Sequence, residues 1–149
     1  MIMNNVNVFD VATYILDKKG TMSAMKLQKL VYYCQAWSLV WDDKPIFNSQ
    51  IEAWSNGPVC RDLYDKHRGQ FQVQADNFAE FAKGKLNKDQ KETIEVVLKA
   101  YGDKSAQWLS DQTHSEAPWI EARKGLGDLE RGFNEITLNS MMEYYSSLT

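Results

Sequence analysis

The residues best suited to binding chemistry form a cluster in the last third of the chain: Thr113, His114, Pro118, Trp119 and Arg123. His114 falls near the end of a predicted helix, where its protonation responds to local dipoles. Trp119 and Arg123 are four residues apart, so the guanidinium can lie against the indole as a cation–π pair. Trp and Arg dominate interface hot spots, so one interpretation is a partner-binding site. The alternative is a helix–helix corner, with His114 bonded to a carbonyl and Trp119 in the core.

A second candidate is a polar stripe made of Gln28, Tyr32 and Gln35, at positions i, i+4 and i+7 of one predicted helix. Buried amides need hydrogen-bond partners. One interpretation is that the stripe lines a groove for a partner. The other, which we favour, is that these side chains pair with backbone of a β element and fix its docking.

The segment IEAWSNGPV supplies a third group, Trp54, Gly57 and Pro58. Trp54 ends a predicted strand and is expected to be core more than contact. Gly57 suits a turn that needs positive φ, and Pro58 suits the first position of a following helix. A free helix N-terminus there would also attract an anion or a partner's carboxylate. The structural interpretation of Gly57 and Pro58 is favoured.

Catalytic and metal chemistry have weak support in the sequence. Cys34, Cys60, His67 and His114 are scattered, with no Cys-x-x-Cys or His-x-x-x-His spacing. A Cys–His nucleophile pair is formally available. Cys34 lies in an apolar helix, which is the wrong environment for a thiolate, and Cys60 is the better candidate. No Gly-rich phosphate loop or nucleophile elbow is present. We therefore expect no enzyme, no metal and no cofactor.

Length and charge narrow the class of protein. The chain has 149 residues and a net charge of −3, which fits a single domain over 1–149. Basic and acidic residues number 13 and 12 up to Gly102, and 4 and 8 after it. Nucleic-acid binding depends on clustered Lys and Arg, so no nucleic-acid partner is expected. The start, MIMNNVNV, lacks a signal peptide, and the two cysteines read as reduced thiols of a cytoplasmic protein.

These residues must be positioned by a central helix predicted over 23–41, with Ser23 as its cap. From Val31 onward the helix is apolar on every side, as in a membrane span or a core helix. A span needs about 20 mostly apolar residues, so we predict a core helix and no membrane association.

The other predicted elements follow from periodicity and turn signals. Two short strands are expected at 46–47 and 51–54, and the segment 70–86 is left open apart from a strand-like QFQVQ. Helices are expected at 8–19, from Pro58 to before Gly69, at 87–101, at 106–112, at 117–124 and from Thr137 to the end. The fold class is thus mainly α (α+β): a compact helical domain around a central apolar helix, with a small antiparallel β-hairpin.

The order of these motifs resembles a known family. The series KLQKLVYYCQAW, PIFNSQIEAWSNGPV, Tyr64, TH-x-x-x-PW-x-x-AR and MMEYY resembles the Panacea domain family, with its SocA-like antitoxins and phage-associated GepA proteins. The resemblance runs from about Val8 to Tyr145. It implies an antitoxin that neutralises a cognate toxin protein by direct binding. It also implies, for SocA-type members, an adaptor that hands the toxin to a AAA+ protease.

The sequence therefore yields one main hypothesis and two rivals. The main hypothesis is a toxin-binding antitoxin without catalysis, with Gln28, Tyr32, Gln35, Trp54, Gly57, Pro58, His114, Trp119 and Arg123 as candidate partner-binding residues. The first rival is a phage- or prophage-borne adaptor or inhibitor of a host protein. The second is a small hydrolase that uses Cys60 or His114.

Overall fold

The structure is a computed structural model that describes residues 5–149. Residues 1–4, which entered the prediction about a signal peptide, lie outside this range. The helices are α1 (Val8–Lys19), α2 (Ala24–Trp41), α3 (Arg61–His67), α4 (Lys88–Tyr101), α5 (Ala106–His114), α6 (Ala117–Ala122) and α7 (Leu138–Ser146). The strands are β1 (Met22–Ser23), β2 (Ile51–Trp54), β3 (Gly57–Cys60), β4 (Gln72–Val73) and β5 (Glu135–Ile136). The prediction of a mainly α protein with a small antiparallel β element is confirmed.

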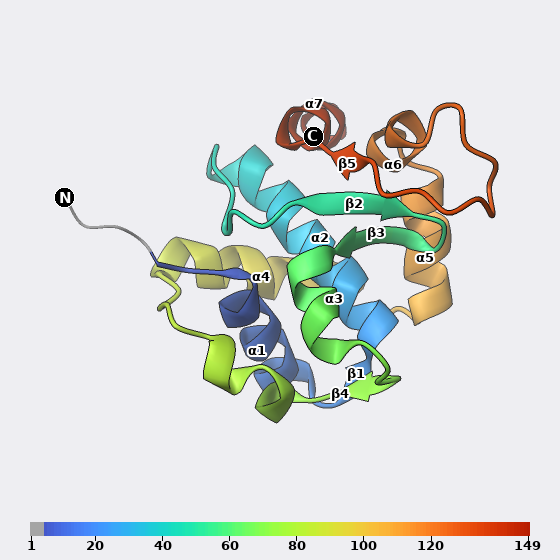
Figure 1. Cartoon of the computed structure of the whole chain (residues 1–149). Coiled ribbons are helices and arrows are strands. Elements are labelled where there is room, and N and C mark those ends of the chain that lie inside the picture. The colour runs from blue at the N-terminus through green and yellow to red at the C-terminus, as the bar shows by residue number, and fades with distance from the viewer. Residues whose placement is uncertain (1–4) are drawn as a thin grey trace.

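Helix α2 is the element on which the others pack, as its sequence predicts. The Ser23 hydroxyl caps it by accepting a hydrogen bond from the Lys26 amide at 3.1 Å. Most of its apolar residues are buried, because α1, α4, α5, α7, β1 and β3 all contact it, whereas Trp41 at its end is 45% exposed. Figure 1 shows α2 running through the middle of the molecule, with the β2–β3 hairpin lying across it.

The β-hairpin differs from the predicted one. β2 pairs antiparallel with β3, with Ala53 opposite Pro58 and Trp54 opposite Gly57. Pro58 therefore lies in a strand and does not begin a helix, and α3 begins at Arg61. Proline is tolerated there because β3 is an edge strand of the order β3-β2-β5. The strand predicted at 46–47 was wrong, since that segment forms no strand.

Two small pairings complete the strands of the described residues. β5 pairs with β2, with Ile51 opposite Ile136, and this strand was not predicted. β1 pairs with β4, which lies in the strand-like QFQVQ stretch. After β4 the chain makes two short 3₁₀ turns, Ala75–Asn77 and Ala79–Phe81. These turns explain why periodicity was uninformative in 70–86, because they are shorter than one repeat of an amphipathic pattern.

Helix ends follow the predicted capping residues closely. Asn87 and Gln90 form the expected capping box at the start of α4. Thr137 caps α7 by accepting from the Ser140 amide at 3.1 Å. Gly20 ends α1 with φ of 82°. Within residues 5–149, no helix has both the length and the apolar character needed to cross a bilayer.

Candidate functional site

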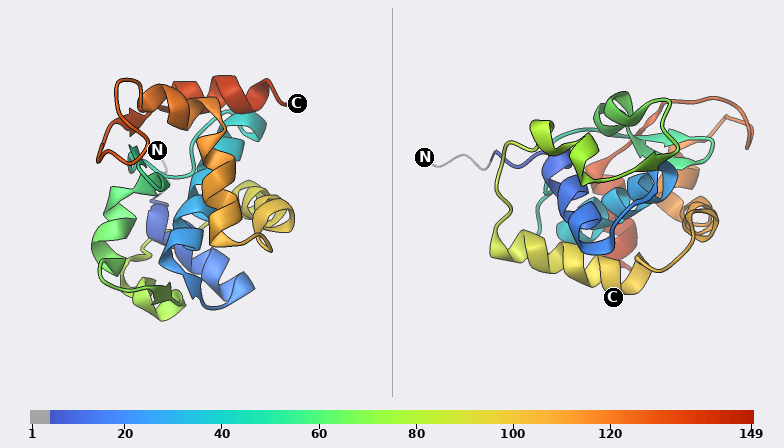
Figure 2. Two further views of the ribbon diagram at one scale, coloured as in Figure 1. Left: turned by 90° about the vertical axis from the view of Figure 1, so that its right-hand side faces the viewer. Right: turned by 90° about the horizontal axis from the view of Figure 1, so that it is seen from below.

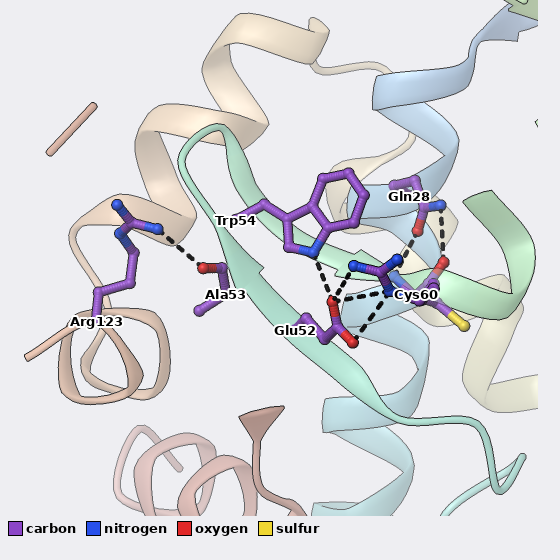
Figure 3. A network of polar contacts seen from close by, with 7 residues as sticks. Gln28, Glu52, Ala53, Trp54, Cys60 and Arg123 are labelled. Atoms are coloured by element: carbon purple, nitrogen blue, oxygen red, sulfur yellow. Dashed lines mark hydrogen bonds and ion pairs between the residues drawn. The ribbon is translucent and has the colours of Figure 1, made fainter. Parts of the chain in front are cut away.

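Gln28 and Gln35 fix β and loop backbone to the central helix, as favoured from the sequence. The Gln28 amide donates to the Cys60 carbonyl at 3.2 Å and accepts from the Cys60 amide at 2.9 Å. Gln35 donates to the Phe47 carbonyl at 2.8 Å and accepts from the Ile46 amide at 2.8 Å. Figure 3 shows the two Gln28–Cys60 bonds joining α2 to the end of β3. Both side-chain amides are buried, so they hold these backbone segments against α2 inside the protein.

His67 completes the Gln28 contact and has its protonation state set by it. The Gln28 oxygen accepts from Cys60, so its nitrogen must be the donor toward His67 Nε2, at 3.0 Å. If the His67 ring were protonated, its Nε2–H and the Gln28 amide N–H would be two donors facing each other. Burial, a backbone hydrogen bond and the nearby charge of Lys29 act on this ring, and burial dominates to lower the pKa of His67.

Tyr32 belongs to a buried hydroxyl–carboxylate network that the sequence did not reveal. Its hydroxyl lies 3.0 Å from that of Tyr145, which donates to Glu116 at 2.7 Å. Tyr33 donates to the same Glu116 oxygen at 2.8 Å. Burial raises the pKa of all three phenols. The network joins α2, α7 and the start of α6 in the core, where it ties the helices together.

Trp119 and Arg123 form the predicted cation–π pair, with the guanidinium carbon 5.2 Å from the ring. Both are buried. The Trp119 indole donates to the Trp54 carbonyl at 2.8 Å, and Arg123 donates to the Ala53 carbonyl at 3.0 Å. Arg123 also donates to the carbonyls of Gly127 and Glu130. Figure 3 shows Arg123 reaching β2 from the side opposite Trp54. The geometry matches the corner interpretation, in which α6 is fastened to the hairpin.

The hairpin's outer side carries an aromatic and charged cluster that we call the hairpin patch: Glu52, Trp54, Arg61, Tyr64 and Phe133. The Trp54 ring packs edge-on against those of Tyr64 and Phe133, at 4.8 and 5.7 Å between centroids. The Arg61 guanidinium lies 5.4 Å from the Trp54 ring and 5.0 Å from the Phe133 ring. Trp54 is half-buried and Phe133 is 46% exposed, so Trp54 is a surface aromatic as well as a packing one.

Glu52 fixes the positions of the Trp54 and Arg61 side chains in the hairpin patch. Its carboxylate accepts from the Trp54 indole at 2.8 Å and pairs with Arg61 at 3.3 Å. Figure 3 shows Glu52 and Trp54 pointing toward one another from the same face of β2. A fixed indole and a fixed guanidinium lose little conformational freedom when a partner docks.

His114 lies with Lys29 at a cavity of about 330 Å³ between α2, the hairpin turn and α5. We call it the Lys29 pocket. Its other lining residues are Ser23, Met25, Asn56, Phe71, Ala106, Gln107 and Ser110. The His114 ring stacks on Trp119, with 4.0 Å between ring centres. Figure 2 (left) shows α5 running beside α2.

The two titratable groups that line this pocket, Lys29 and His114, both have lowered pKa values. Burial lowers the pKa of the Lys29 ammonium from 10.5 to about 7. Burial, and secondly the charge of Lys29, lower the pKa of His114. Within the described part of the chain, neither Lys29 Nζ nor His114 Nε2 has a hydrogen-bond partner. Sequence reasoning missed Lys29, because a lysine in the first turns of a helix is usually a solvated residue.

Gly57 makes room for that lysine. Its φ is 122°, as the turn prediction required, although it belongs to β3 and not to a helix start. A Cβ at this position would meet Lys29 Cε at 2.5 Å and Thr113 Oγ1 at 3.1 Å. The hairpin turn therefore closes directly over the Lys29 side chain.

The two thiols lie in surroundings that favour the protonated form. Cys34 and Cys60 are free and buried. Burial raises the pKa of the Cys60 thiol to about 11 and that of Cys34 further. A thiolate nucleophile needs the opposite shift. Among residues 5–149, no three His, Cys, Asp or Glu side chains come together as a metal site.

The fold and these sites define a mainly helical protein with a buried polar framework and two surface features, the hairpin patch and the Lys29 pocket. The family described as "Antitoxin SocA-like, Panacea domain" matches residues 27–120, more than half of the chain. The chain belongs to this family. The matched range includes most of α2, the hairpin, α5 and Trp119, but ends before Arg123 and Phe133. Neither a curated protein nor a solved structure shows significant similarity to the chain.

Proposed function

We propose that this protein is a single-domain cytoplasmic antitoxin that neutralises a cognate toxin by binding it directly, without catalysis. Membership of the antitoxin SocA-like family is the observation that carries this proposal. The environment of the thiols agrees with it, because burial raises the pKa of Cys60 to about 11 and disfavours a nucleophile. A binding protein needs a surface with suitable anchors, and the described residues offer one.

We infer that the hairpin patch is the docking surface for the toxin. It combines Trp, Tyr, Phe and Arg, the residue types that anchor protein interfaces. Arg61 has a side chain 45% exposed, and Phe133 is 46% exposed, so both are available to a partner. Its base is held by the Glu52–Trp54 and Glu52–Arg61 contacts. Of the buried candidates, Gln28, Trp119 and Arg123 hold the backbone of the hairpin from inside. Tyr32 and Gln35 bind elsewhere in the core.

The function is tested by co-expression with the flanking gene. Cells that express the neighbour alone are expected to stop growing, and co-expression of this chain is expected to restore growth. The two proteins should then co-purify as one complex. A neighbour that is harmless by itself would contradict the antitoxin function.

The surface is tested with Arg61→Ala and Phe133→Ala. Each substitution removes an exposed anchor and is expected to weaken toxin binding by about 2 kcal/mol, which is roughly thirtyfold in Kd. Lys88→Ala and Val96→Ala are the matched controls: Lys88 forms a weak ion pair with Glu92, and Val96 is 50% exposed on α4. Equal losses in the controls and the test variants would place the toxin elsewhere.

A pull-down from the native host separates the rival roles. A host regulator as the sole partner favours an adaptor or inhibitor of a host protein. We further propose that this protein delivers the toxin to a AAA+ protease. The toxin's half-life should then shorten when this protein is present. A toxin half-life unchanged by this protein would leave neutralisation by masking alone.

A further inference from the structure

The Lys29 pocket is a built feature of the fold. Lys29 is 1% exposed, on the helix that forms the centre of the core. The absence of a side chain at Gly57 provides its space, since a Cβ would lie 2.5 Å from Lys29 Cε. A backbone conformation at φ of 122° is therefore used to enclose a lysine.

The lysine has no counter-charge among the described residues. Its Nζ makes no hydrogen bond, and no ion pair of residues 5–149 includes it. Buried ammonium groups are normally paired with a carboxylate or surrounded by acceptors. An unpaired one that lines a cavity is a group prepared for an external partner.

His114 supplies a second unpartnered atom from the opposite wall. Its Nε2 lies buried without a partner among the described residues. Stacking on Trp119 at 4.0 Å fixes the plane of the ring. Lys29 and His114 line the same cavity with their nitrogens buried behind its wall, so one small ligand meets both groups when that wall yields.

We propose that the Lys29 pocket binds a carboxylate group carried on an apolar body, through Lys29 and His114. One ammonium without a counter-ion matches a monoanion better than a phosphate of charge near −2. The apolar body would lie against Met25 and Phe71 at the pocket's edge, where Phe71 is 77% exposed. The cavity of about 330 Å³ is large enough for one side chain or a small acid.

The carboxylate has two sources with the same chemistry. It belongs either to a free small acid or to a polypeptide, as a chain end or an acidic side chain. The second source rests on the proposed function, because the toxin would then insert the group while it docks.

The test uses phenylacetate and its neutral analogue phenylacetamide, titrated into the ¹⁵N-labelled full chain and followed by NMR. Phenylacetate is expected to shift the amide signals of residues that line the pocket, and phenylacetamide is not. Lys29→Met is expected to weaken phenylacetate binding at least about tenfold, since a charge-assisted hydrogen bond is lost. Lys26→Met, on the same helix but outside the pocket, should bind as the unmodified protein does.

Equal binding of the amide and the acid, or undiminished binding by Lys29→Met, would overturn the proposal. His114→Gln is the second variant if Lys29→Met does not fold, and it too should weaken the binding of phenylacetate. A peptide ending in Phe with a free carboxylate, compared with its C-terminal amide, identifies the polypeptide source when only the free acid binds. Binding of phenylacetate with no binding of the peptide identifies a small acid.

The co-expression assay separates this inference from the proposed function. A harmless neighbouring gene would contradict the antitoxin function and leave the NMR result standing. The other outcome is a toxic neighbouring gene. If the Lys29→Met variant then fails to neutralise the toxin and the Lys26→Met variant succeeds, the carboxylate belongs to the toxin. Full neutralisation by Lys29→Met leaves the pocket to a small acid.

Discussion

Gly57 and Lys29 occupy complementary space: a Cβ on residue 57 would lie 2.5 Å from Lys29 Cε. The hairpin turn and the central helix therefore constrain each other through one missing side chain and one long one. Neither residue is informative alone, since a Gly after Ser-Asn reads as a turn and a Lys early in a helix reads as solvent-exposed.

Gly57→Ala is expected to lower the free energy of unfolding by about 2–4 kcal/mol, because it combines positive-φ strain with a steric clash. Gly125→Ala is the control: its φ is 87°, but nothing lies within 4 Å of the added methyl group, so only about 1–2 kcal/mol of strain is expected. Urea denaturation measures both. Pairing Gly57→Ala with Lys29→Ala should cost less than the sum of the single changes. An additive pair would show that the clash is relieved elsewhere.

Lys29 should make stability rise with pH just above neutrality. The pKa of Lys29 is about 7 in the folded protein, against an ordinary value of 10.5 for an exposed lysine, so between these values the unfolded chain binds more protons. The free energy of unfolding therefore increases with pH in this window. From pH 7 to 8.5 the gain from this residue is about 1.5 kcal/mol, taking 1.36 kcal/mol per pH unit as the upper slope.

The measurement is the difference between unmodified protein and Lys29→Met in urea at pH 7 and 8.5. Taking the difference cancels groups that titrate in both proteins. His67, His114, Asp111 and Arg123 are the charged or titratable groups that interact with Lys29 or with His114 beside it. The two histidines have lowered pKa values and titrate below the window. A pH-independent difference would contradict a buried, unpaired Lys29.

Glu116 should be among the costliest polar residues to replace. Its carboxylate accepts from Tyr33 at 2.8 Å, from Tyr145 at 2.7 Å and from Gln112 at 3.1 Å. Glu116→Ala leaves the buried Tyr33 hydroxyl without its acceptor and Tyr145 with only the Tyr32 hydroxyl, with an expected loss of about 3 kcal/mol. Tyr145→Phe removes one donor and should cost about 1–2 kcal/mol.

Thermal or urea unfolding checks the Glu116 prediction, with Tyr144→Phe as the control. Tyr144 is adjacent in sequence but less buried, and its hydroxyl makes no hydrogen bond to the described residues. Its loss should be within about 0.5 kcal/mol. Similar losses for Tyr145→Phe and Tyr144→Phe would argue against the network as a stabilising unit.

The elements that sequence could predict were those with local signals. Ser23, Asn87 and Thr137 each cap the helix that was expected to follow, because capping depends on residues within one turn. The hairpin was predicted with the wrong partner strand. Gly57–Pro58 is a strong helix-start signal, but pairing of Pro58 opposite Ala53 at a sheet edge overrode it. β5 was missed because two residues carry no periodicity.

The candidate sites show the same division. The Trp119–Arg123 contact was predictable from a spacing of four, and it is present at 5.2 Å. Whether such a pair faces solvent or the core depends on the hairpin carbonyls of Trp54 and Ala53, which are distant in sequence. The hairpin patch could not be predicted from the sequence. Phe133 is distant from Trp54 along the chain, and the pairing of β5 with β2 brings the two rings together.

Thiol reactivity gives a prediction that separates a binding protein from a Cys-dependent hydrolase. Cys34 and Cys60 are buried, and burial raises the pKa of Cys60 to about 11, so the fraction of thiolate near pH 7.5 is very small. Neither thiol of the folded protein is expected to react with a disulfide reagent at that pH within the time in which both react in urea. Cys60→Ala should leave rescue from the flanking gene's toxicity unchanged within about twofold, provided that the variant stays folded. Rapid modification of Cys60 in the folded protein, together with loss of rescue in Cys60→Ala, would instead indicate nucleophilic chemistry at this position.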